Sequence, residues 1–222
     1  MFIGHFGLAY AAKRASPTTS LATLFAAASF VDILWPIFLL FGVETIHITP
    51  GATGLTAIQF VSYPYTHSLL MGIVWGIVFG GVYWLARRSS RGAIVLRLLV
   101  LSHWVLDLIV HQPDLPLYPG DTHRLGFGLW NSVTGTLVVE CALFAIGVAI
   151  YFASTRALDW RGRIGAWLTV LVLVASYAAN VWGGSPLSVQ IIVYSAFVGT
   201  VVILLLAWWS DRHRIADGIR PG

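Results

Sequence analysis

The sequence predicts an all-α membrane protein, a polytopic transmembrane helical bundle that occupies residues 1–222 as a single integral membrane domain. Of the 222 residues, 58% are hydrophobic and only 10% are charged, whereas soluble domains carry about 25% charged residues. The mean hydropathy of +0.82 agrees, since so much apolar surface needs a bilayer as its solvent. The basic residues also gather between the apolar stretches, a pattern typical of multi-span proteins.

Six apolar stretches are long enough to cross a bilayer, which takes about 20 residues each. They are residues 21–43, 67–86, 93–111, 130–152, 164–181 and 187–209. Residues 2–12 are too short to cross, and they predict a half-inserted or interfacial helix. This N-terminal stretch lacks the basic n-region and the cleavage site of a signal peptide, so we expect it to remain in the mature protein.

The positions of Lys and Arg predict the orientation of the bundle. The six-span arrangement places one group of basic residues on one side of the membrane: Lys13, Arg14, Arg87, Arg88, Arg91, Arg156, Arg161, Arg163, Arg212, Arg214 and Arg220. The other side receives only Arg124. We therefore expect the basic N- and C-terminal segments to be cytoplasmic and the two long loops to face outward.

The sequence disfavours two classes of function: nucleic-acid binding and transport by a protein built from inverted repeats. The net charge of +4 follows the inter-span clusters, so the expected partner is the lipid bilayer and not nucleic acid. No internal repeat is visible, which disfavours a transporter built from inverted halves. The single cysteine, Cys141, excludes an internal disulfide.

Ionisable residues inside the predicted spans point to a functional site, because each costs about 2.5–3.5 kcal/mol at the centre of a membrane helix. At a rise of about 1.5 Å per residue, Asp32 and Glu140 lie about 15 Å from the outer end of their spans, His103 about 12 Å and Asp107 about 6 Å. His67 and His111 stand at outer span ends. These depths predict one polar cavity that opens outward.

The segment SHWVLDLIVH places His103, Asp107 and His111 at i, i+4 and i+8, on one face of a helix. Imidazole and carboxylate together suit a divalent metal, most naturally zinc, and His67 and Asp32 could complete the ligand set. Such a set would support metal-assisted hydrolysis, with Glu140 or His111 moving protons. The structural alternative is a His–Asp pair that holds helices together.

Other interpretations remain open at this point. Glu140 is equally suited to be a ligand, a general base or a hydrogen-bond partner within the bundle. A transporter or channel would use the same groups to relay ions, and would need a polar path to the cytoplasmic side, where the spans are apolar apart from Arg97. A b-type haem protein would use His67 with His103 or His111 as axial ligands. The loop residues His47 and His123 are expected to be solvated.

Four short motifs together resemble a known family. They are an early His in MFIGHFG, an Asp in SFVDILWP, a THS step in SYPYTHSLL and HxxxD in LSHWVLD. They are similar to motifs of the LexA-binding, inner-membrane-associated, metal-dependent hydrolases of bacteria, which are distantly related to zinc-dependent phospholipase C and P1-type nucleases. The resemblance covers about the first 140 residues and implies a bacterial inner-membrane enzyme that cleaves a phosphoester or ester at the outer side, with a lipid head group as one candidate substrate.

The resemblance implies a set of metal ligands: His5, Asp32, His67, His103 and Asp107. The chain departs from the family pattern in having only one Asp near position 32 and no second HxxxD, so we expect one or two metals. In the relatives the amine of the mature N-terminal residue also binds metal, a role that we do not assign to an uncleaved Met1. If Lys13 marks the membrane surface, His5 lies about 12 Å deep and Asp32 about 20 Å, so they meet only if the N-terminal helix is inserted more deeply.

Overall fold

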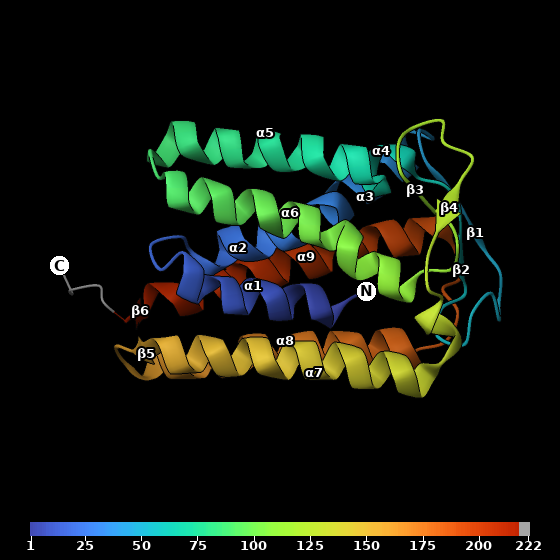
Figure 1. Cartoon of the computed structure of the whole chain (residues 1–222). Helices are drawn as coiled ribbons and strands as arrows, with labels where there is room; N and C mark the ends of the chain where they lie inside the picture. The colour runs from blue at the N-terminus through green and yellow to red at the C-terminus, as the bar shows by residue number, and fades with distance from the viewer. Residues whose placement is uncertain (218–222) are drawn as a thin grey trace.

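The computed structural model describes residues 1–217 and consists mainly of long helices packed side by side (Figure 1). The helices are α1 (Ile3–Ala15), α2 (Leu21–Ala28), α3 (Phe30–Leu40), α4 (Pro64–His67), α5 (Leu69–Arg87), α6 (Ser90–Val110), α7 (Val133–Ser154), α8 (Trp160–Trp182), α9 (Val189–Arg212) and the 3-10 turn η1 (Leu129–Asn131). The strands form three short antiparallel pairs: β1 (Thr45–Ile48) with β2 (Ile58–Ser62), β3 (Leu115–Pro116) with β4 (Arg124–Leu125), and β5 (Thr155–Ala157) with β6 (Arg214–Ala216). The predicted all-α bundle is confirmed.

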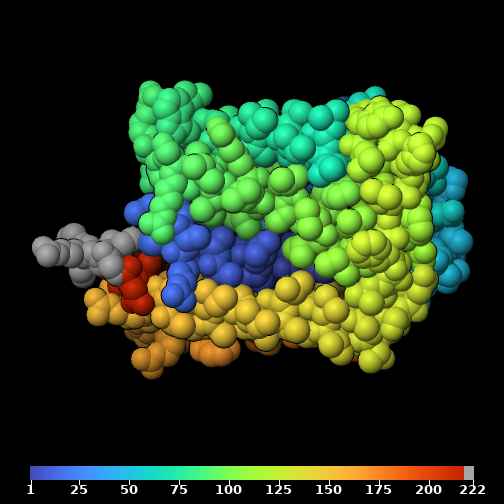
Figure 2. Space-filling view, in the orientation of Figure 1, coloured from blue at the N-terminus to red at the C-terminus, as the bar shows by residue number. Residues whose placement is uncertain are grey.

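Five helices, α5 to α9, are long and apolar enough to cross a membrane, and the count is six if α2 and α3 form one broken span. They correspond to the predicted spans. In α5 and in α9, only 17% of the 18-residue apolar stretch that could cross the membrane is buried inside the protein. Large apolar side chains such as Leu85, Leu171 and Val198 are more than 60% exposed. The sides of the bundle, of which Figure 2 shows one face, therefore suit contact with acyl chains.

The two ends of the bundle differ in charge and in structure. The α1–α2 turn, the α5–α6 turn, the β5 connection and the end of α9 all lie at one end, at the left of Figure 1. This basic end holds the clustered Lys and Arg residues of the sequence, except that Arg220 lies outside the described residues. The opposite, capped end is covered by β1 to β4 and includes Arg124. The expected segregation of basic residues is thus present in the structure.

The first predicted span is broken by a bend of 54° between α2 and α3. Ser29 stands at the break, and its hydroxyl donates a hydrogen bond of 2.9 Å to the Phe25 carbonyl, a back-bond that bends helices. The last carbonyls of α2 have no partner within that helix, so they are free to accept from other side chains. The bend also places Asp32 in the first turn of α3, where the helix dipole favours a carboxylate.

Helix α1 is inserted into the bundle and is not an interfacial helix. Ala9 and Tyr10, in its middle, are completely buried. Its basic flank is also drawn inside, because the Lys13 ammonium is 2.8 Å from the Asp211 carboxylate and donates to the Thr19 carbonyl at 2.9 Å. Lys13 therefore does not mark a solvated surface, and the depth estimate based on it placed α1 too shallow.

Two glycines bring the backbones of α1 and α7 into direct contact. A Cβ built on Gly147 would lie 1.9 Å from the Gly7 carbonyl oxygen, and one built on Gly7 would lie 2.6 Å from the Leu143 carbonyl oxygen. No side chain fits between the helices at this crossing. The contact fixes where along α7 the N-terminal helix can sit.

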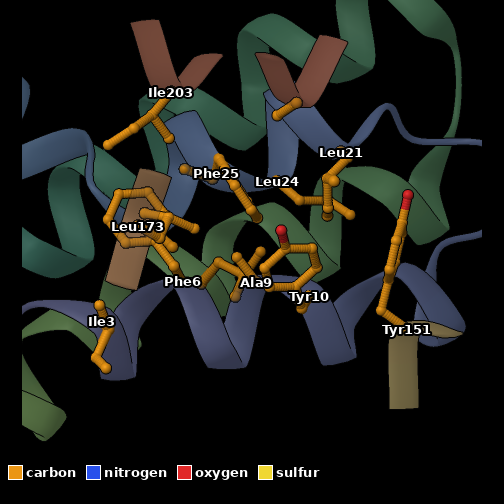
Figure 3. Packing of buried hydrophobic residues seen from close by; sticks show 14 of the residues in the cluster. Ile3, Phe6, Ala9, Tyr10, Leu21, Leu24, Phe25, Tyr151, Leu173 and Ile203 are labelled. Atoms are coloured by element: carbon orange, nitrogen blue, oxygen red, sulfur yellow. The ribbon is translucent and has the colours of Figure 1, made fainter. Parts of the chain in front are cut away.

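The interior between α1 and α2 is packed with apolar and aromatic side chains (Figure 3). Phe6 and Tyr10 of α1 meet Phe25 of α2 edge-to-face, with ring centroids 5.1 and 4.8 Å apart. Leu21 and Leu24 are fully buried beside them. The interior toward the basic end is therefore filled by a hydrophobic core.

Gly147→Ala is expected to lower the free energy of unfolding by about 1–3 kcal/mol, because its methyl group would overlap the Gly7 backbone and force the helices apart. Thermal unfolding in detergent measures the change. Gly199→Ala is the matched control, since a Cβ at Gly199 meets nothing within 4 Å. Equal unfolding temperatures for the two variants would contradict the close α1–α7 contact.

Candidate metal centre

The five predicted ligands come together from four helices inside the bundle. His5 lies on α1, Asp32 on α3, His67 at the end of α4, and His103 and Asp107 on α6. Two sets of ligand atoms lie within 4.8 Å of one another, His5–His103–Asp107 and Asp32–His67–His103, so His103 belongs to both. The depth problem for His5 disappears because α1 is inserted.

The imidazole Nε2 atoms surround the two carboxylates at short distances. Asp107 Oδ1 is 3.1 Å from His5 Nε2, and Asp107 Oδ2 is 3.1 Å from His103 Nε2. Asp32 Oδ1 is 3.4 Å from His67 Nε2 and 3.5 Å from His103 Nε2. Of these four contacts, the His5–Asp107 contact has hydrogen-bond geometry. Ligand atoms about 2.0–2.1 Å from a tetrahedral zinc ion are about 3.3 Å apart, so the observed spacing matches the edges of such a site.

The tautomer of His103 is set by a backbone carbonyl. His103 Nδ1 is 2.8 Å from the Ala28 carbonyl oxygen, and because a carbonyl only accepts, Nδ1 must carry the proton. In the neutral ring, Nε2 then presents a lone pair toward Asp32 and Asp107. The break between α2 and α3 thus provides the acceptor that orients a central imidazole.

His67 is oriented through a chain of polar groups from the capped end. Thr66 Oγ1 donates to Glu44 Oε2 at 2.7 Å and lies 2.7 Å from His67 Nδ1. Since the hydroxyl has one proton, His67 Nδ1 donates to it, and Nε2 again presents a lone pair to the centre. Glu44 also accepts from the amides of Tyr65 and Thr66, and burial raises the pKa of its carboxyl group. Sequence reasoning missed Glu44, because the β1–β2 hairpin separates it from Thr66 along the chain.

His111, at the end of α6, also has its Nδ1 proton held by an oxygen acceptor. Its Nδ1 is 3.0 Å from Asp114 Oδ1, which also accepts a 2.6 Å hydrogen bond from the Tyr63 hydroxyl. Its Nε2 faces Asp107 Oδ2 at 3.7 Å. Asp114 was not predicted, although its position three residues after His111 in HQPD is a local signal that could have indicated the pair.

Three lone pairs and two carboxylates therefore converge in a buried space. Among residues 1–217, no Lys or Arg side chain pairs with Asp32 or Asp107, and the one other cationic group beside them is the N-terminal ammonium of Met1, 2.5 Å from Asp107 Oδ1. Ionised carboxylates facing imidazole lone pairs repel unless a proton or a metal cation lies between them. Histidines whose outer nitrogen donates to a fixed oxygen are typical of metal sites, and this donor set fits zinc.

His5 differs from the other histidines. Its ring stacks on His103 with centroids 3.8 Å apart, and its Nε2 makes the hydrogen bond to Asp107. Its outer nitrogen, Nδ1, is buried and has no hydrogen-bond partner in the described part of the chain. The nitrogen of Met1, to which sequence reasoning gave no role, lies 2.5 Å from Asp107 Oδ1.

Glu140, predicted to move protons, lies outside both sets of ligand atoms. Its Oε2 accepts from the amides of Phe2 at 2.7 Å and Gly4 at 3.3 Å. A carboxylate in this position satisfies the free N–H groups at the start of α1. Glu140 thus holds the first turn of the helix that presents His5.

Asp32 is the one partly exposed residue among the five. The side chain of Asp32 is 41% exposed, whereas those of His5, His67, His103 and Asp107 are 2–4% exposed. His47 is exposed, as is the side chain of His123, so both are solvated as expected.

No protein-family model, no curated protein and no solved structure matches the chain. The chemistry of the centre is therefore inferred from its own residues and geometry.

Glu140→Ala is expected to lower the free energy of unfolding by about 1–3 kcal/mol, because it leaves buried amides of α1 without an acceptor. Glu140→Gln keeps an acceptor oxygen and should cost less. Thermal unfolding of the two variants in detergent tests this, with Cys141→Ala as an exposed control on the same helix. If the Gln variant is as unstable as the Ala variant, the capping role is wrong.

Proposed function

We propose that the chain is a membrane-embedded, metal-dependent hydrolase that acts on a phosphoester or ester, with a lipid head group as the substrate. His5, Asp32, His67, His103 and Asp107 would hold a divalent metal, zinc by its donor set. The observation that carries the proposal is the convergence of imidazole lone pairs on two carboxylates that, in the described part of the chain, have no Lys or Arg partner; the Met1 ammonium contacts Asp107 alone. A bound metal would supply Lewis-acid stabilisation of the substrate oxygen and acidify water.

Residues around the ligands have separate tasks in this proposal. His111 Nε2, 3.7 Å from Asp107 Oδ2, is within reach of a molecule at the centre and accepts or returns a proton there. Asp114 holds the opposite ring nitrogen of His111 and fixes its orientation. Glu140 positions α1 and hence His5. The exposed side of Asp32 is where the substrate approaches.

The resemblance to the inner-membrane metal-dependent hydrolases supports the same activity. Its four motifs supply the five residues that meet at the centre. Together with the positive-inside rule, it supports a bacterial inner membrane with the basic end in the cytoplasm and the capped end outside. In that orientation the substrate reaches the centre from the outer leaflet.

The geometry favours this proposal over its rivals. A transporter needs a polar path through the bundle, but Phe6, Tyr10 and Phe25 pack the interior toward the basic end. Purely structural His–Asp pairs need hydrogen bonds, and the short contacts of Asp32 with His67 and His103 lack that geometry. The mixture of carboxylates with imidazoles suits a divalent metal ion better than the paired axial histidines of a haem.

The first expected result is near-stoichiometric zinc or another divalent metal in protein purified without chelators. His103→Ala and Asp107→Ala should lose it, because each removes a ligand shared by the centre. Elemental analysis of the folded proteins measures this, and His47→Ala is the control because His47 is exposed and belongs to neither set of ligand atoms.

The activity is tested on the same samples with phosphodiester, carboxylester and phospholipid substrates. Hydrolysis is expected in the parent and in His47→Ala, and not in His103→Ala. A metal-free parent overturns the proposed metal centre. A metal-loaded parent that cleaves none of these bonds overturns the proposed hydrolase and leaves the metal site standing.

Thr66→Val is expected to weaken metal binding about 10- to 100-fold, because it removes the hydroxyl that joins His67 to Glu44. Competition with a chelator of known affinity measures the change. Thr45→Val provides a matched control at an exposed position of β1. Unchanged affinity in Thr66→Val would show that His67 does not need this support.

A further inference from the structure

A pocket lies at the basic end, and none of its lining residues belongs to the candidate metal centre. It has a volume of about 270 Å³ and is lined by Thr18, Tyr83, Ala86, Arg87 and Ser89. These residues belong to the α1–α2 connection and to the α5–α6 turn, which Figure 1 shows at the same end of the bundle. The lining offers one guanidinium and three hydroxyl groups and contains no carboxylate, which is the chemistry of an anion site.

The charge around this pocket is not balanced by the protein. Arg14, Arg87, Arg88 and Arg91 lie on the two turns, and Arg91 Nε donates to the Ala15 carbonyl at 2.6 Å, which ties the turns together. In the described residues none of these four arginines pairs with a carboxylate. Lys13, which lies in the same connection as Arg14, is paired with Asp211.

Arg88 shows that the turn keeps an arginine at a conformational cost. It ends α5 with φ of 53°, the one positive φ of a non-glycine residue in the described chain. Glycine is the usual residue at such a helix end. The Arg88 guanidinium lies over the Trp84 ring, 5.2 Å from its centroid, and Trp84 is itself exposed on α5.

The pocket also adjoins the lipid-facing side of α5. Val82 and Leu85, in the last turns of this helix, are 62% and 61% exposed. A ligand held by Arg87 can therefore place its polar group among the hydroxyls of the pocket and its apolar chains along the surface of α5. A soluble anion would use only the first of these surfaces.

We infer that this pocket binds the phosphate of an anionic phospholipid in the leaflet at the basic end. The planar guanidinium of Arg87 matches phosphate oxygens, and Thr18, Tyr83 and Ser89 supply further donors. Arginine clusters beside membrane helices recognise anionic head groups through the same combination of charge and hydrogen bonds. The inference does not depend on the proposed hydrolase activity.

The test uses the full chain in an uncharged detergent and a fluorescent phosphatidylglycerol, compared with phosphatidylcholine of the same acyl chains. Phosphatidylglycerol should bind more tightly, and Arg87→Gln should weaken its binding about fivefold. Arg87→Lys should retain part of the affinity. Arg156→Gln is the matched control, because Arg156 is an exposed arginine of β5 at the same end of the bundle and does not line the pocket.

Two further measurements complete the design. Thr18→Val removes a hydroxyl donor without changing the charge, so it should weaken phosphatidylglycerol binding less than Arg87→Gln does. If Arg87→Gln does not fold, the binding measured for Thr18→Val tests the inference. Glycerol phosphate should compete only weakly with the lipid. Equal binding of the two lipids, an equal loss in Arg156→Gln, no loss in Thr18→Val, or glycerol phosphate binding as tightly as the lipid would each overturn the inference.

Discussion

The electrostatic balance of Asp32 and Asp107 is the constraint on which the centre depends. Both carboxylates lie within an apolar bundle, and they face the Nε2 atoms of His67, His103 and His111, whose protons are held on the opposite side of the ring. Ala28, Thr66 and Asp114 supply the oxygens that hold those protons. The arrangement leaves negative charge and lone pairs directed at one small volume, which a divalent cation would neutralise.

Irregular backbone makes this arrangement possible. A straight first span would use its carbonyls internally, whereas the break at Ser29 frees the Ala28 carbonyl and starts α3 just before Asp32. A second break, after His67, lets that residue come from the short α4 rather than from α5. Helix α1 is held at its start by Glu140 and at its end by Asp211, so His5 is fixed beside His103. Helix ends inside the bundle thus supply the free Ala28 carbonyl and the short helix that carries His67, which continuous spans would not provide.

The fold was largely predictable because hydropathy determines the positions of the spans, and the clustering of basic residues indicates which connections share one end of the bundle. The meeting of four of the five candidate ligands was predictable as well, since acids and histidines in apolar stretches have few structural explanations, whereas His5 was indicated only by the family resemblance. The bend at Ser29 was missed because hydropathy carries no information about the hydrogen bond from the Ser29 hydroxyl to the Phe25 carbonyl. Glu44 and Asp114 were missed because both lie in loops, where polar residues are ordinary. The insertion of α1 was underestimated because Lys13 looked like a surface residue, and its partner Asp211 is 198 positions away.

The hydrophobic packing of α1 against α2 has a consequence for the energetics of the cell. The interior between the centre and the basic end is closed by aromatic rings such as those of Phe6 and Phe25. Within the described residues, these packed rings leave no polar path from the five candidate ligands toward the basic end. Under the proposed function, turnover would therefore carry no ion between the two ends of the bundle and would neither consume nor dissipate an ion gradient.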